Sequence, residues 1–209
     1  MNKPEIIIIG AGGHARACID VIEQHGKFKI AGLVGKSDEM HLHYFGHDVI
    51  ATDKDMQKLV KEYKYAFIAI GQINSPNNRT QHYQQLIEMG FQLPTIISPS
   101  AIVSRYATIG SGTIIMNGCI LNAGVKVGLN SIINTSALLE HDVKVGDHCH
   151  VSTGTILNGD VTIGSESFIG SGSVIKQGVS IGKNTLIGMG LSVRHDQPDN
   201  SRFVGKIKV

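Results

Sequence analysis

The stretch that decides the fold is ALLEHDVKVGDHCHVSTGTILNGDVTIGSESFI, residues 137–169, in which a branched aliphatic residue recurs at every sixth position. The same phase runs without interruption over residues 103–193. All 16 positions of the series are Ile, Leu or Val: Val103, Ile109, Ile115, Leu121, Val127, Ile133, Leu139, Val145, Val151, Leu157, Ile163, Ile169, Ile175, Ile181, Ile187 and Val193. If about a third of positions were branched aliphatics by chance, such a run would have a probability on the order of 10⁻⁸, so an internal repeat is the strongest feature of the sequence.

A second series, two positions before the first, consists of small or β-branched residues, with Leu191 as its one larger member. Two positions that share a face and recur every six residues predict a short strand followed by a tight corner. Three strands and three corners would form one triangular coil of about 18 residues, with each aliphatic stacked on its counterpart one coil away. Many corners carry glycine, and we expect these glycines to adopt positive φ: Gly110, Gly128, Gly146, Gly164, Gly182 and Gly188.

The N-terminal half has a different pattern, in which short apolar runs alternate with amphipathic segments. This order predicts a small βαβ unit with a mostly parallel sheet, whose ligand would lie beyond the carboxyl ends of the strands. Strands are expected at residues 5–10, 29–34 and 65–70, and helices from the glycine-rich turn to about His25, at 53–63 and at 77–89. Two prolines in Leu93 to Pro99 mark the boundary, giving domains 1–94 and 95–209.

The first strand runs into the turn Gly10-Ala11-Gly12-Gly13-His14-Ala15. Backbone N–H groups at such a helix start suit phosphate oxygens, so the turn is a candidate phosphate site. The acidic residue that an NAD site would need at the end of the second strand is absent, because Gly35-Lys36 stands there. A phosphate-bearing sugar nucleotide therefore fits better than a redox dinucleotide, with a purely structural turn as the third reading.

The overall composition argues against several classes of protein. The formal net charge is +2 and no Lys/Arg run stands out, which disfavours nucleic acid as a partner. The apolar run Ile6–Ile9 is too short for a membrane span or a signal peptide, and we expect a cytoplasmic protein. Three cysteines fit a reducing compartment, and Cys119 and Cys149 should lie on different faces because their spacing of 30 residues is no multiple of 18.

His141 is the residue of greatest chemical interest in the repeat. It follows the core aliphatic Leu139 by two positions, which places it on an exposed corner between Glu140 and Asp142. Neutral imidazole beside a carboxylate is a suitable general base, because the carboxylate fixes the tautomer and stabilises the charged form. The alternative interpretation is that His141 is merely a solvated corner residue without a catalytic role.

Four segments carry a family resemblance: Gly10 to His14, the strand Phe67-Ile68-Ala69-Ile70-Gly71, Asn134 to Asp142, and His150-Val151-Ser152-Thr153-Gly154. Together they resemble hexapeptide-repeat sugar acetyltransferases of the sialic-acid O-acetyltransferase-like family, which includes bacterial nucleotide-amino-sugar N-acetyltransferases. The resemblance implies a left-handed parallel β-helix after the α/β domain, a homotrimer with active sites between subunits, and acetyl-CoA as co-substrate without a metal. It also implies the site residues: His141 as base with Asp142 or Glu140 as orienter; Gly10, Gly12, Gly13, His14 and Gly71 at the nucleotide-linked amino sugar; and Asn134, His150, Gly159, Ser171, Met189, Gly190 and Lys206 along the acetyl-CoA groove.

The chain departs from the family pattern at two places. Gly35-Lys36 replaces an acidic pair that usually helps to hold the nucleotide, and the C-terminal segment containing Lys206 replaces the usual Gly-x-Pro-Ala-Lys. Three alternatives remain open at this stage. These are O-acetylation of a sialic-acid-like sugar, a non-catalytic nucleotide-sugar-binding trimer, and a metal site among His141, His148, Cys149 and His150, which the absence of a His-x4-His pair disfavours.

Overall fold

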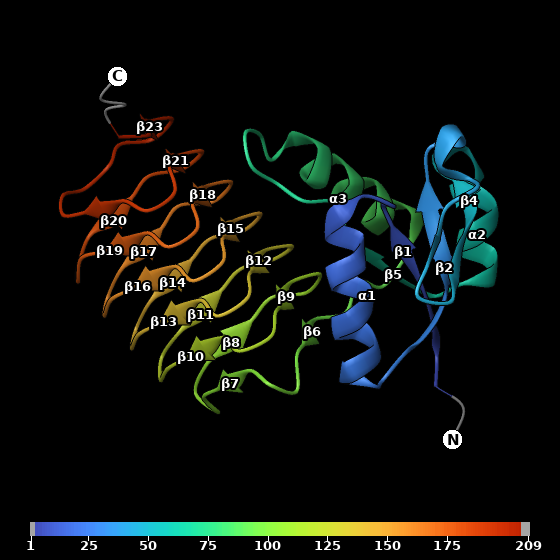
Figure 1. The fold of residues 1–209 in the computed structure, drawn as a ribbon, viewed down its shortest axis with the longest axis horizontal. Coiled ribbons are helices and arrows are strands. Elements are labelled where there is room, and N and C mark those ends of the chain that lie inside the picture. The colour runs from blue at the N-terminus through green and yellow to red at the C-terminus, as the bar shows by residue number, and fades with distance from the viewer. Residues whose placement is uncertain (1–2, 206–209) are drawn as a thin grey trace. The chain divides into compact units, whose positions relative to one another are not determined.

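The computed structural model describes residues 3–205 (Figure 1). The chain divides into two compact units. The first contains the described residues up to Gly71 together with Asn77–Ile97, and the second contains Gln72–Pro76 and the described residues from Ser98 onward. The short segment 72–76 therefore belongs to the second unit although it lies within the sequence of the first.

The first unit is built on a sheet with the strand order β3-β4-β2-β1-β5. Its strands are β1 (Glu5–Ile9), β2 (Lys29–Gly35), β3 (His43–Tyr44), β4 (His47–Thr52) and β5 (Tyr65–Ile68). All neighbouring pairs are parallel except β3 with β4, so the mostly parallel sheet expected from the sequence is confirmed. The β3–β4 hairpin was not predicted from the sequence, and its turn places Phe45 and Gly46 at positive φ.

Helices cover both faces of this sheet. The helical segments are α1 (Gly13–His25), η1 (Ser37–Glu39), η2 (Asp53–Asp55), α2 (Met56–Glu62) and α3 (Asn77–Met89), and the unit ends with the short strand β6 (Ile96–Ile97). Ile7 and Ile9 pack in one cluster with side chains of α2 and α3, including Leu59 and Leu86. Since Ile6 and Ile8 alternate to the other face and are fully buried, that face is covered as well, and α1 lies on the opposite side of the sheet from α2 (Figure 1).

The strand order creates a topological switch point at β1. The chain leaves β1 through α1 to β2 and β4 on one side, and returns to β5 on the other side. In open parallel sheets, ligands bind in the crevice outside the carboxyl ends of the strands at such a point. The glycine-rich turn, which directly follows β1, is therefore located where a ligand is expected.

The second unit is a parallel β-helix of two-residue strands in three sheets (Figure 1). Sheet I contains β7 (Ile102–Val103), β10 (Ile120–Leu121), β13 (Leu138–Leu139), β16 (Ile156–Leu157), β19 (Val174–Ile175) and β22 (Ser192–Val193). Sheet II contains β8 (Thr108–Ile109), β11 (Lys126–Val127), β14 (Lys144–Val145), β17 (Thr162–Ile163) and β20 (Ser180–Ile181). Sheet III begins with β6, and its strands within the second unit are β9 (Ile114–Ile115), β12 (Ile132–Ile133), β15 (His150–Val151), β18 (Phe168–Ile169), β21 (Leu186–Ile187) and β23 (Arg202–Phe203).

The six-residue phase predicted the interior of this unit correctly. Each aliphatic of the series pairs with its counterpart 18 residues away, as Leu139 does with Leu157. The series is buried from Ile115 to Val193, while Val103 and Ile109, in the first coil, are only partly covered. The companion positions are buried from Thr113 to Thr185, so the two series together fill the column over these coils. The array has to be continuous because a single coil cannot bury its own faces.

The conformation predicted for six corner glycines is wrong. Positive φ is found at none of these six glycines, which are Gly110, Gly128, Gly146, Gly164, Gly182 and Gly188. Instead, positive φ occurs at the third residue after nearly every strand, for example at Gly172, Asn130 and Asn184. Glycine is required at the sheet II corners for lack of space. A Cβ on Gly164 would lie 2.5 Å from the backbone nitrogen of Lys183 and 2.6 Å from the carbonyl carbon of Gly182, in the next coil.

Two glycine-to-asparagine substitutions should separate these two requirements. Gly172→Asn should leave stability within about 0.5 kcal/mol, because Asn tolerates the left-handed region and no atom lies within 4 Å of the added Cβ. Gly164→Asn should cost about 2 kcal/mol or more, because the side chain would collide with backbone. Urea unfolding at one fixed protein concentration measures both. Equal destabilisation by the two variants would contradict this assignment.

Candidate active site

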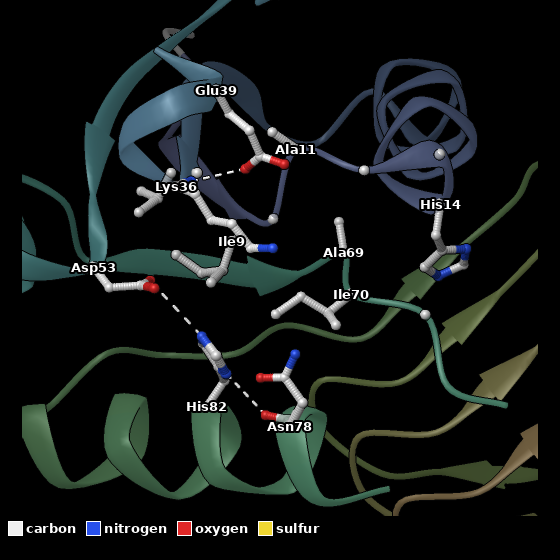
Figure 2. Close-up of a pocket in the computed structure, with 16 residues that line it drawn as sticks. Ile9, Ala11, His14, Lys36, Glu39, Asp53, Ala69, Ile70, Asn78 and His82 are labelled. Atoms are coloured by element: carbon white, nitrogen blue, oxygen red, sulfur yellow. Dashed lines mark hydrogen bonds and ion pairs between the residues drawn. The ribbon is translucent and has the colours of Figure 1, made fainter. Parts of the chain in front are cut away.

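A cavity of about 400 Å³ lies at the carboxyl ends of the strands in the first unit. It is lined by residues that follow four strands: Gly10–His14 after β1, Gly35 and Lys36 at the end of β2, Asp53 after β4, and Ala69–Gly71 after β5 (Figure 2). Its volume is within the range of small-molecule sites. All five residues expected at the sugar nucleotide, Gly10, Gly12, Gly13, His14 and Gly71, line this one cavity.

Specific contacts shape the glycine-rich turn beside the cavity. Gly10 has φ +107°, and a Cβ there would lie 2.9 Å from Cγ1 of Ile70, so both conformation and space require glycine. The hydroxyl of Tyr44 donates a hydrogen bond of 3.0 Å to the carbonyl of Ala11. Gly12 forms the N-cap of α1 without a side-chain cap. The first N–H groups of the helix are thus not capped by a side chain and can donate to an anion in the cavity.

Besides Lys36, three ionisable groups that line the cavity were not identified as site residues from the sequence: Glu39, Asp53 and His82. Glu39 accepts a 2.7 Å hydrogen bond from the backbone N–H of Lys36, which returns a carboxylate to the end of β2, where the family's usual acidic pair is missing. The Nδ1–H of His82 donates to the carbonyl of Asn78 over 2.8 Å, and its Nε2 lies 3.7 Å from Oδ1 of Asp53 (Figure 2). Strand β4 was not predicted from the sequence, and this strand places Asp53 at the cavity.

His141 lies on the corner that follows sheet I, as its phase predicted, and its side chain is 57% exposed. Its Nδ1 lies 3.0 Å from Oδ2 of Asp142, whereas Glu140 accepts a 2.8 Å hydrogen bond from the side-chain amide of Asn122. An ionised carboxylate can only accept, so Nδ1 carries the proton and Nε2 keeps its lone pair. Between the two candidate orienters, the geometry favours Asp142.

Gly159 occupies the same corner one coil further along, directly beside the imidazole. A Cβ on Gly159 would lie 2.5 Å from Nε2 of His141 and 2.6 Å from its Cε1. Any side chain at residue 159 would therefore displace the ring. The absence of a side chain leaves the lone pair of Nε2 accessible.

A second hollow of about 530 Å³ in the second unit gathers four residues that were predicted to line the acetyl-CoA groove. Asn134, His150, Ser171 and Met189 lie together along sheet III and the corner that follows it. The other groove residues are elsewhere: Gly159 is on the His141 corner, Gly190 is not among the lining residues, and Lys206 is outside the described residues. The predicted groove residues thus belong to two different corners of the column.

His150 is held in one tautomer by contacts within the second unit. Its Nδ1–H donates to the carbonyl of Gln72 over 2.6 Å, so Nε2 accepts from the side-chain amide of Asn134 at 3.1 Å. The side chain of Gln72 in turn donates to the carbonyl of His148. His150 is directed away from the column interior, as predicted, but it is only 6% exposed. Both of its ring nitrogens make hydrogen bonds, which distinguishes it from His141.

Among residues 3–205 there is no group of three or more His, Cys, Asp or Glu side chains placed to hold a metal ion. No helix in the same range has the length and apolar character needed to cross a bilayer.

Two family models match the chain: the PglD N-terminal domain over residues 5–86, and the hexapeptide repeat of succinyl-transferase over residues 160–194. No curated protein sequence gives a significant match. Among solved structures, perosamine N-acetyltransferase from Caulobacter crescentus is 32% identical, with a TM-score of 0.90, and the alignment covers 96% of this chain and 93% of that one. The chain belongs to the hexapeptide-repeat sugar acetyltransferases.

The acetyltransferase domain of PglB from Neisseria gonorrhoeae is a second relative of this family. It is 29% identical, with a TM-score of 0.88 and 97% coverage of both chains. The family resemblance and the assignment as an acyltransferase are thereby confirmed, and so is the fold class, a small α/β domain followed by a left-handed parallel β-helix.

The cysteines have properties that do not suit a nucleophile. Cys18, Cys119 and Cys149 are free and buried, and the last two precede strands of different sheets, as their spacing predicted. Burial raises the pKa of Cys18 and of Cys149 to about 12, and that of Cys119 to about 11. All three are protonated thiols at neutral pH, while the nucleophilic form is the thiolate.

A thiol reagent should therefore find no reactive cysteine in the native protein. With an excess of an aromatic disulfide reagent at pH 8, we expect no rapid release of the coloured thiol, because raised pKa values and burial both slow the reaction. The same protein in denaturant should release three equivalents, one for each cysteine. A fast-reacting thiol in the native state would contradict the buried environments described above.

Proposed function

We propose that the protein transfers the acetyl group of acetyl-CoA to the amino group of a nucleotide-linked amino sugar, with His141 as general base and no covalent enzyme intermediate. The observation that carries the proposal is the exposed imidazole of His141, with Nδ1 on Asp142 and Nε2 open beside Gly159. This is the arrangement of a base whose tautomer is fixed by a carboxylate.

The relatives support the choice of substrates. Structures of the Caulobacter crescentus enzyme contain CoA and GDP-perosamine, and in two of them a histidine is replaced, by asparagine in one and by alanine in the other. The Neisseria gonorrhoeae domain has been solved in complex with acetyl coenzyme A. In this chain, the cavity at the glycine-rich turn would hold the phosphates of the nucleotide through the uncapped start of α1.

In the proposed reaction, His141 takes up one proton from the amine and returns it to the leaving thiolate. The sugar nitrogen attacks the thioester carbonyl and passes its proton to Nε2 of His141. The oxyanion of the tetrahedral intermediate needs a donor, and the backbone N–H of Gly159 has no hydrogen-bond partner among residues 3–205. Collapse expels the CoA thiolate, which takes the proton back from the imidazolium, so His141 ends each turnover neutral.

The proposal includes an assembly of several subunits. We take the active unit to be a homotrimer with each site between two subunits, in which the His141 corner of one subunit would face the sheet III hollow of its neighbour. The predicted groove residues lie on these two corners, and no single corner holds them all. In this arrangement Gly159 of one subunit would lie in the same site as Asn134, His150, Ser171 and Met189 of a neighbouring subunit.

A panel of GDP-, UDP-, dTDP- and CMP-linked amino sugars with acetyl-CoA tests the proposal. We expect thiol release with at least one of them and a product heavier by one acetyl group that survives hydroxylamine, because an amide resists the treatment that cleaves an ester. The matched sugar with a hydroxyl in place of the amine is the control. Transfer to that hydroxyl would establish an O-acetyltransferase, and binding without thiol release would establish a non-catalytic protein.

Substitution of the histidine tests the mechanism. His141→Ala should lower kcat by about 10²-fold or more with the fold intact, and Gly159→Ala should do so in part by displacing the ring. His43→Ala is the matched control, because His43 pairs with Asp48 at 2.7 Å and is equally exposed at 57%. Initial rates at saturating substrates measure all three. Unchanged turnover of His141→Ala would remove this residue from the mechanism.

A further inference from the structure

A buried arginine lies next to the cavity at the glycine-rich turn without lining it. Arg79 is in the first turn of α3 and is only 1% exposed. Burial lowers the pKa of Arg79 to about 10, so the guanidinium keeps its positive charge at neutral pH. Burying a charged group costs free energy unless hydrogen bonds compensate for the lost water. The contacts of Arg79 therefore show which part of the chain this charge stabilises.

These contacts are with the backbone at the end of β5. Nη1 of Arg79 donates to the carbonyl of Ile68 over 2.6 Å and to the carbonyl of Ile70 over 3.0 Å. Carbonyls two residues apart in an extended segment point to the same side. The backbone N–H of Ala69 points to the other side, where it donates to the carbonyl of Ile9 in β1 over 2.8 Å. Because β5 is the end strand of its sheet, Arg79 satisfies carbonyls on the outer edge of that sheet.

The segment held in this way forms one wall of the cavity, which we call the β5 wall. It consists of Ala69 and Ile70 (Figure 2) together with Gly71. The β5 wall packs tightly against the glycine-rich turn, because a Cβ on Gly10 would lie 2.9 Å from Cγ1 of Ile70 and 3.4 Å from the carbonyl oxygen of Ala69. A shift of the β5 wall would therefore change the shape of the turn as well. The width of the cavity depends on where Arg79 holds this wall.

We propose that Arg79 is a positioning residue of the cavity: it fixes the β5 wall at the distance from the glycine-rich turn that a nucleoside diphosphate needs. The identity of this ligand rests on the proposed function. Arg79 is not among the described residues that line the cavity, so it acts through the backbone that it holds. The two hydrogens of Nη1 lie in the guanidinium plane, so one rigid group fixes both carbonyls. Its charge, 3.0 Å from the carbonyl oxygen of Ile70, also favours an anion in the cavity.

Hydrogen exchange of the ligand-free protein tests the positioning directly. Arg79→Met keeps a long side chain but removes both donors, which leaves the carbonyls of Ile68 and Ile70 without this partner. We expect the amides of residues 69–71 to exchange about tenfold faster or more, while amides of α1 and of the second unit change less than about twofold. Arg79→Lys keeps the charge and a donor group and should show a smaller increase. It also provides the test if Arg79→Met does not fold.

Binding of nucleoside diphosphates tests the consequence for the site. GDP, UDP and dTDP are titrated by calorimetry, and the one that the wild-type protein binds most tightly is used. Its Kd should rise about tenfold in Arg79→Met and less in Arg79→Lys. In turnover, the KM for the nucleotide sugar should rise with little change in kcat or in the KM for acetyl-CoA. Leu86→Ala is the matched control, because it removes a buried side chain of the same helix that cannot donate to a carbonyl; its Kd should stay within about twofold of wild type.

The outcomes separate this role from general stabilisation of the fold. Faster exchange confined to residues 69–71 together with weaker diphosphate binding supports the proposal. Unchanged exchange there, or unchanged diphosphate binding, in a folded variant overturns it. Equal acceleration across the whole first unit, or an equal loss of binding in Leu86→Ala, also overturns it, because Arg79 would then stabilise only the fold. If the wild-type protein binds none of the diphosphates, the proposed substrate fails, while exchange at residues 69–71 still decides whether Arg79 positions the β5 wall.

Discussion

The second unit depends on one constraint, the in-register pairing of two-residue strands with their counterparts in the next coil, which lie 18 residues away except where β21 pairs with β23. Backbone N–H groups of one coil donate to carbonyls of the next throughout the column, as Leu138 does to Thr155 and Lys144 to Val161. This pairing brings successive coils to the spacing of neighbouring strands, about 4.8 Å. Every corner residue therefore lies beside the corner residue of the next coil, and the chemistry of a corner is decided by residues 18 positions apart.

The surroundings of His141 follow from that spacing. The corner must take a left-handed residue at its third position, and Asp142 occupies it with φ +61°. Its backbone N–H donates to the carbonyl of Ala123 in the preceding coil, while its side chain reaches the Nδ1 of the adjacent imidazole. One coil further along, Gly159 leaves room for the ring. A strained backbone position thus orients the carboxylate, and the missing side chain of Gly159 leaves room for the imidazole.

Much of this architecture could be predicted from the sequence because it depends on local periodicity. The sixfold phase located the buried residues, the exposed corner of His141 and the separation of Cys119 from Cys149, and the alternation of apolar and amphipathic segments located the strands around the glycine-rich turn. The requirement for glycine at residue 164 could not be read correctly, because it arises from contact with the backbone of the next coil, around Lys183. Glycine is favoured at residue 172 because of its backbone conformation, and it is required at residue 164 because there is no space for a side chain.

Contacts between distant segments account for what the sequence did not reveal. The β4 strand was missed because its alternating pattern is short, and with it the approach of Asp53 to the cavity. The carboxylate of Glu39 returns to the end of β2 only because η1 turns the chain back by three residues. Likewise, the carbonyl of Gln72 reaches His150 across 78 residues of sequence, which no pattern predicts.

The histidines of the second unit show why contacts, more than residue type, decide which of them can act as a base. The Nδ1 of His148 lies 3.0 Å from the side-chain amide of Asn130, and both nitrogens of His150 are used in hydrogen bonds. A base needs one ring nitrogen fixed by an acceptor and the other open to the substrate. His141 has this arrangement, because Asp142 accepts from Nδ1 and Gly159 has no side chain to cover Nε2. Burial keeps the three cysteines protonated, which agrees with the direct attack on the thioester that we propose in place of a cysteine nucleophile.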